Sequence, residues 1–132
     1  MAEGLREAVR RRADGRCEYC RLPESHSALP FELEHIIAEK HGGKTVLNNL
    51  AYACRYCNAY KGPNIAGIDP KSGAVVPLFD PRRDRWRLHF RWKGPELVGL
   101  TPTARATVEV LRINHPEMVA LRRSLMNEGV EF

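Results

Sequence analysis

Four cysteines stand in two pairs, and each pair has two residues between its members. The pairs are Cys17/Cys20 and Cys54/Cys57, and 33 residues separate Cys20 from Cys54. Four thiolates in this arrangement suit tetrahedral zinc. A closed shell of four sulfurs leaves no position for water, so the predicted zinc is structural. Binding of this kind can contribute roughly 10–16 kcal/mol to folding.

Three other uses of the cysteines are weighed against zinc. The first residues lack the apolar core of a signal peptide, so we expect a cytoplasmic protein, where disulfides are rare. A redox pair is disfavoured because no strand–helix–strand pattern surrounds either CxxC motif. Iron–sulfur clusters also use four cysteines, but at other spacings. Structural zinc is therefore the preferred interpretation.

A second set of residues, Glu34, His35 and Asn58, has the chemistry of an open metal site. Glu34 offers a carboxylate oxygen and Asn58 an amide oxygen, ligands that suit Mg²⁺ together with water and a phosphate oxygen. Consecutive helical residues diverge by about 100°, so Cys57 can face zinc while Asn58 faces elsewhere. Because histidine can accept a proton at neutral pH, His35 could activate a water molecule beside that ion.

The elements that must position these residues follow from local patterns. Neighbouring residues on a strand point to opposite faces, so Glu34 and His35 converge only where the strand twists, bulges or ends. The sequence predicts a helix over residues 3–13, a strand over 31–37, a loop around Gly42-Gly43, a return strand over 49–53 and a short helix from Cys54 to Gly62.

The stretch from Arg16 to Gly62 resembles the HNH endonuclease family, whose core is the ββα-metal finger. By this resemblance, His35 is the general base, Glu34 and Asn58 bind the catalytic ion, and the reaction is hydrolysis of DNA phosphodiester bonds. The resemblance also implies that Asn49 braces the loop that holds His35, and that Lys61 contacts nucleic acid. The matching motifs are Cys17-x-x-Cys20, Glu34-His35-Ile36, Gly42-Gly43, Asn49-Leu50, Cys54-x-x-Cys57-Asn58 and Lys61-Gly62.

Two positions depart from the usual pattern of that family. Glu34 stands where aspartate is more common, and Asn58 stands where the motif often has histidine. An amide oxygen is a harder ligand than imidazole, so we expect the catalytic ion to be Mg²⁺ or Mn²⁺ in preference to Zn²⁺ or Ni²⁺.

The second half of the chain is read as an extension with a β-hairpin and two helices. Apolar and basic residues alternate over 84–92, which predicts a strand that residues 97–100 would pair with. Its basic residues Arg85, Arg87 and Arg91 could contact phosphates, or they could form the solvated face of a half-buried strand. Thr101 and Pro102 favour the start of a helix, and a second helix follows Pro116.

The apolar content and the positive net charge are typical of a small globular protein that binds a polyanion. The 132 residues are 43% apolar, carry a formal net charge of +5 and contain no apolar run of membrane-spanning length. We therefore expect an α+β protein with an HNH core over 1–66 and an extension over 67–132, packed as one unit. The expected partner is DNA, most simply double-stranded. The alternatives are a zinc-stabilised nucleic-acid-binding module without catalysis and, favoured only by the CxxC pairs, a redox enzyme.

Overall fold

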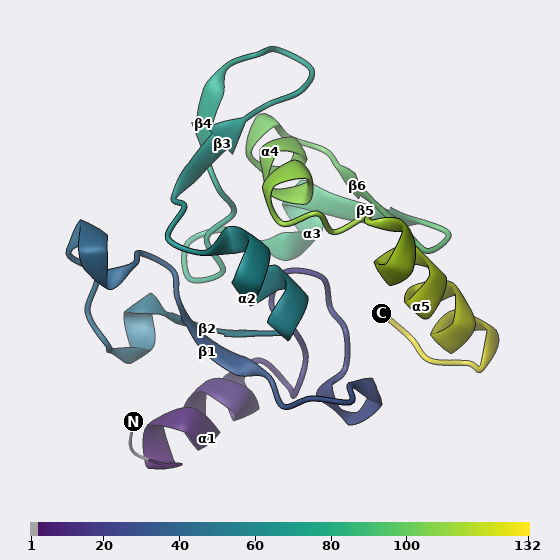
Figure 1. The fold of residues 1–132 in the computed structure, drawn as a ribbon, viewed down its shortest axis with the longest axis horizontal. Coiled ribbons are helices and arrows are strands. Elements are labelled where there is room, and N and C mark those ends of the chain that lie inside the picture. Colours follow the sequence, from purple (N-terminus) through teal and green to yellow (C-terminus); the bar gives the residue numbers. More distant parts are fainter. Residues whose placement is uncertain (1–2) are drawn as a thin grey trace.

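The computed structural model describes residues 3–132, which form an α+β fold with three separate two-stranded antiparallel sheets (Figure 1). This confirms the predicted fold class. In the first half, β1 and β2 pair with Glu34 opposite Ala51 and His35 opposite Leu50. The elements of this half are α1 (Glu3–Arg12), β1 (Glu32–His35), β2 (Leu50–Ala53) and α2 (Arg55–Lys61), with 3-10 turns at Glu24–His26, Glu39–His41 and Leu47–Asn49.

The extension contains the predicted hairpin and two helices, and also a hairpin that the sequence did not predict. The missed hairpin is short, and Gly67 interrupts its apolar pattern because α4 packs closely there: an added Cβ would lie 2.7 Å from Val110. The elements are β3 (Ala66–Ile68), β4 (Val75–Pro77), α3 (Trp86–His89), β5 (Phe90–Lys93), β6 (Glu96–Gly99), α4 (Pro102–Val110) and α5 (Pro116–Asn127).

The strand predicted over 84–92 is wrong in its first half. Residues Trp86–His89 form one helical turn, and the strand begins only at Phe90. A helical turn brings residues four apart together. Trp86 thereby packs on Phe90 with ring centroids 5.2 Å apart, and Leu88 is left 67% exposed. Aromatic packing has overridden the alternating pattern.

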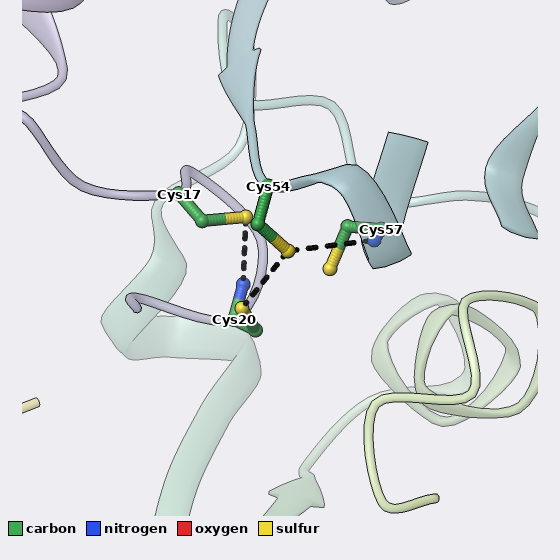
Figure 2. Close-up of side chains that lie close together, drawn as sticks. All are labelled: Cys17, Cys20, Cys54 and Cys57. Carbon is green, nitrogen blue, oxygen red and sulfur yellow. Dashed lines mark hydrogen bonds between the residues drawn. The ribbon is translucent and has the colours of Figure 1, made fainter. Parts of the chain in front are cut away.

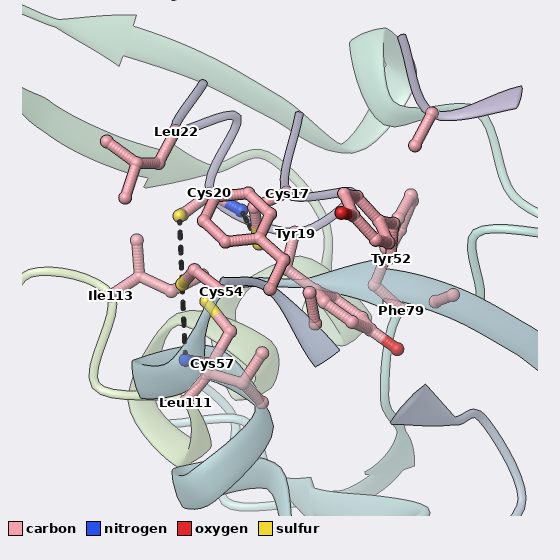
Figure 3. Close-up of a cluster of buried hydrophobic side chains, with 14 of the residues drawn as sticks. Cys17, Tyr19, Cys20, Leu22, Tyr52, Cys54, Cys57, Phe79, Leu111 and Ile113 are labelled. Atoms are coloured by element: carbon pink, nitrogen blue, oxygen red, sulfur yellow. Dashed lines mark hydrogen bonds between the residues drawn. The ribbon is translucent and has the colours of Figure 1, made fainter. Parts of the chain in front are cut away.

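The finger and the extension share one hydrophobic core, although the boundary predicted at residue 66 stays a prediction. Trp86 donates a hydrogen bond from Nε1 to the carbonyl oxygen of Tyr19 at 2.9 Å, and Arg82 forms an ion pair with Glu18. Figure 3 shows Leu111 and Ile113 from the extension beside the cysteines of the finger. The segment around the cysteines is thus enclosed by both halves of the chain.

A buried ion pair ties the turn between β3 and β4 to α4. Arg105 donates from Nε and Nη2 to the two carboxylate oxygens of Asp69, at 2.8 and 2.9 Å. Asp69 is fully buried, and the hydrogen bonds from Arg105 hold the pKa of that carboxyl well below its usual range. None of the helices between residues 3 and 132 is both long and apolar enough to cross a membrane.

Close packing of β6 against α4 depends on the missing side chain of Gly99. A Cβ there would lie 2.6 Å from the backbone nitrogen of Arg105. We expect Gly99→Ala to lower the free energy of unfolding by about 1–3 kcal/mol through overpacking, measured by denaturant titration. Gly4→Ala, where a Cβ would meet no atom within 4 Å, is the control and should be neutral or slightly stabilising. Equal stability of the two variants would contradict this account.

Candidate metal and catalytic site

The four cysteines converge on one point, as predicted. Their sulfur atoms all lie within 4.8 Å of one another, and Cys20 and Cys54 have sulfurs 3.7 Å apart (Figure 2). Four sulfurs around zinc at about 2.3 Å would be separated by about 3.8 Å, so the cluster fits this ion. All four cysteines are buried free thiols. The arrangement is that of a closed structural zinc site.

Local backbone structure presents the sulfurs in two similar turns. Cys54 is the N-cap of α2, and its sulfur accepts from the backbone N–H of Cys57 at 3.4 Å. In the first pair, the sulfur of Cys17 accepts from the N–H of Cys20 at 3.5 Å. Arg21 adopts a positive φ of 68°, which turns the chain back after this pair. Each CxxC motif is thus a tight turn that presents its two sulfurs to the same point.

A buried arginine lies near the cysteine cluster. Arg122 is fully buried and donates to the carbonyl oxygens of Pro95 and Ile113. Burial lowers the pKa of Arg122, while the charges of Cys20, Cys57 and Cys54 act in the opposite direction. Four thiolates around a divalent ion carry a net charge of −2, so Arg122 is a favourable neighbour for the loaded cluster.

Removing one cysteine should remove both zinc and the fold. We expect Cys57→Ala to lose the bound zinc and its cooperative melting transition, because zinc binding of this kind supplies roughly 10–16 kcal/mol of folding free energy. Zinc content by mass spectrometry and helix content by circular dichroism test this. His26→Ala is the control, since His26 is an exposed histidine close to the first pair and should retain one zinc per chain. Full zinc content in Cys57→Ala would contradict the four-sulfur assignment.

His35 ends strand β1 and points its imidazole at the following loop. Its Nε2 is 2.8 Å from the hydroxyl oxygen of Thr45 and 3.8 Å from a carboxylate oxygen of Glu39. The side chain is 20% exposed. His35 is therefore partly accessible, with a hydroxyl and a carboxylate beside the nitrogen that would exchange a proton.

Asn49 makes hydrogen bonds across the loop that follows His35. Its Oδ1 accepts from the N–H of Ile37, and its Nδ2 donates to the carbonyl oxygens of Ile37 and Lys44, all at 2.9 Å. Gly43 makes this closure possible, because a Cβ there would lie 1.7 Å from the carbonyl oxygen of Ile37. Gly43 is thus a steric requirement of the loop, whereas Gly42 supplies a positive φ of 88°.

Glu34 points away from that loop into the protein. It is 3% exposed, accepts from the hydroxyl of Tyr19 at 2.7 Å and forms an ion pair with Lys61. Burial raises the pKa of Glu34, while the charge of Lys61 and the hydrogen bonds from Lys61 and Tyr19 oppose that rise. Glu34 and His35 thus have separate sets of partners, as strand alternation requires.

The expectation that Lys61 contacts nucleic acid directly is wrong. Lys61 is 1% exposed, and its Nζ donates to the carbonyl oxygens of Ile36 at 2.8 Å and His35 at 3.3 Å in addition to its pairing with Glu34. The sequence could not show this, because a lysine in the last turn of a helix normally extends into water. Asn58 is half-buried and lies three residues before Lys61 on α2, so both residues occupy the same side of this helix.

The three arginines expected to contact phosphates, Arg85, Arg87 and Arg91, are all exposed, but they do not lie on one continuous strand. Arg85 precedes α3, Arg87 is within it and Arg91 is on β5. Within residues 3–132, no carboxylate lies within 4.0 Å of the guanidinium group of any of these three arginines. Their positive charges are therefore available to solvent or to an anionic partner.

Sequence reasoning did not identify three residues that contact the candidate site. Tyr19 lies between two zinc ligands and reaches Glu34, while Glu39 and Thr45 approach His35. The position of Tyr19 inside a CxxC motif was a signal, since zinc fixes its backbone. No feature of the sequence distinguishes Glu39 and Thr45 from other loop residues, because polar residues are common in loops.

Residues 17–64 match the model of the HNH endonuclease family. This span includes the four cysteines, β1, the braced loop, β2 and α2, so the match covers the cysteine cluster and His35 together. Comparison with curated proteins and with solved structures gave no match. The family implies a nuclease-type activity on nucleic acid.

Proposed function

We propose that this protein is a metal-dependent endonuclease that hydrolyses DNA phosphodiester bonds with His35 as the general base. The observation that carries the proposal is the placement of His35: it is partly exposed at the end of β1, beside a loop that Asn49 braces and a helix that the cysteine cluster anchors. A binding module has no need for a histidine fixed in this way.

In the proposed reaction, His35 removes a proton from a water molecule whose oxygen attacks phosphorus, and the bond to the 3′ oxygen breaks. The carboxylate of Glu39 lies 3.8 Å from Nε2, on the side of the ring that would take the proton. The hydroxyl of Thr45 fixes the orientation of the ring by its 2.8 Å hydrogen bond. General base catalysis of this kind is typically worth about 10²–10⁴-fold in rate.

The residues assigned to the catalytic ion fit Mg²⁺ or Mn²⁺ in donor chemistry. Glu34 would supply a carboxylate oxygen, and Asn58 an amide oxygen from the side of α2 that also carries Lys61. When bound, such an ion supplies Lewis-acid stabilisation of charge on the phosphate and on the departing oxygen. Glu34 is paired with Lys61, so its carboxylate must release the Lys61 ammonium before it can bind a divalent ion.

His35→Ala should slow nicking of supercoiled plasmid by about 10²–10⁴-fold, because it removes the general base. The assay compares Mg²⁺, Mn²⁺, Zn²⁺ and EDTA, with zinc content and circular dichroism as checks on folding. His41→Ala is the matched control: His41 is exposed in the same loop and should leave the rate nearly unchanged.

Nicking by His35→Ala at the wild-type rate would contradict the proposed base. Equal or faster nicking with Zn²⁺ alone would contradict the preference for Mg²⁺ or Mn²⁺. DNA binding with no His35-dependent nicking in any of these metals would favour the alternative, a zinc-stabilised binding module. The ion pair between Glu34 and Lys61 favours that alternative, because the Lys61 ammonium already occupies the carboxylate that would bind the catalytic ion.

The exposed arginines provide a test of the DNA-binding surface. We expect replacement of Arg85, Arg87 and Arg91 together by glutamine to weaken DNA binding and to flatten its dependence on salt, since each lost phosphate contact reduces the slope of log K against log salt by about 0.9. Fluorescence anisotropy over a salt series measures this. Arg123→Gln, exposed on α5, is a control for loss of one surface charge. An unchanged slope in the triple variant would identify these arginines as a solvated face.

A further inference from the structure

The ion pair between Glu34 and Lys61 lies at the position assigned to the catalytic ion. Its side chains are 2% and 1% exposed, so neither charge is hydrated by bulk water. Buried charges are retained only where partners replace that water. Here the partners of the ammonium are three oxygens near the end of β1: the Glu34 carboxylate and the carbonyl oxygens of Ile36 and His35.

These three oxygens form a binding site for a cation. The cation that binds there is the ammonium of Lys61, the last residue of α2. A lysine ammonium carries one charge, whereas a carboxylate and neutral oxygens are also the ligands that a hard divalent ion takes. A divalent ion that binds Glu34 therefore competes with a resident cation. Such competition requires that the ammonium can go elsewhere, because a buried lysine without a carboxylate partner is unfavourable.

A cavity beside Lys61 offers that second position. It has a volume of about 330 Å³, and its lining includes Lys61, Asp80 and Asp84. Asp80 is only weakly paired, since its closest guanidinium, that of Arg83, is 3.9 Å away. Burial and the charge of Asp84 raise the pKa of Asp80, while the charges of Arg83 and Lys61 oppose this rise. Arg83 is the nearest cation to these two carboxylates, and the charge of Lys61 also acts on Asp80.

We propose that Lys61 is an exchangeable counter-cation: it neutralises Glu34 in the metal-free protein and turns toward Asp80 and Asp84 when a divalent ion binds Glu34. The proposal rests on the metal-binding role of Glu34 in the proposed function. It gives the buried lysine a positioning role, because its departure also releases the backbone carbonyl oxygens of His35 and Ile36.

The first test measures Mn²⁺ affinity of the zinc-loaded protein by electron paramagnetic resonance of free Mn²⁺. Lys61→Met removes the competing charge and should lower the Kd by about tenfold or more, the size of effect that a neighbouring charge has on cation binding by a carboxylate. Lys61→Arg keeps the competing charge and should stay near wild type. The double variant Glu34→Gln with Lys61→Met should lose the tight site. Replacing Asp80 and Asp84 by asparagine should raise the wild-type Kd.

The second test uses the wild-type chain and so does not depend on how a variant folds. Lysines are acetylated with a water-soluble reagent, with and without Mg²⁺, and the products are quantified by mass spectrometry. Lys61 should be protected without Mg²⁺ and labelled with it, because it moves into the cavity. Lys71 is exposed and should be labelled equally in both.

An unchanged or raised Kd in folded Lys61→Met protein, or protection of Lys61 at every Mg²⁺ concentration, would overturn the exchange. If His35-dependent nicking persists in either case, the endonuclease proposal survives and only the exchange fails. Absence of Mn²⁺ binding in both proteins, together with absence of nicking, would instead overturn the role of Glu34 as a metal ligand, and with it the exchange.

Discussion

The convergence of four sulfurs from two distant turns is the constraint on which the rest of this structure depends. Cys57 lies four residues before Lys61 on α2, and Tyr19 lies between Cys17 and Cys20. Both partners of the Glu34 carboxylate are therefore carried by segments that the cysteine cluster fixes. A zinc ion bound there would therefore also fix the positions of the Lys61 ammonium and the Tyr19 hydroxyl beside the buried carboxylate of Glu34.

Buried charges mark the junctions between the parts of the fold. The Glu34–Lys61 pair joins β1 to α2, Asp69–Arg105 joins the β3–β4 turn to α4, and Arg122 joins α5 to the backbone before β6 and after α4. Desolvation offsets much of the attraction within a buried ion pair, so such pairs contribute little net stability. Their effect is geometric, since a misplaced neighbour would leave a charge unpaired and would cost far more than the pair contributes.

Features with a local physical cause could be predicted from the sequence. Cysteine spacing, the N-cap at Thr101 and the helix starts at prolines depend on residues close together in the chain, and the structure contains them. Where residues far apart decide the outcome, prediction failed. Trp86 donates a hydrogen bond to the carbonyl oxygen of Tyr19, which is 67 residues away in the chain, and Lys61 turns inward because Glu34 is buried across from it.

The candidate site is divided between the two sides of one strand end. His35 faces the loop, where Thr45, Glu39 and the Asn49 brace determine its orientation. Glu34 faces the interior, where Tyr19 and Lys61 determine its charge state. Proton transfer and cation binding would thus be adjusted by different side chains, although adjacent residues carry them. Lys61 links the two sides, because its ammonium binds the carboxylate of Glu34 and the backbone carbonyl of His35 together. If a metal ion replaced Lys61 at Glu34, the hydrogen bond from Lys61 to the backbone carbonyl oxygen of His35 would therefore change as well.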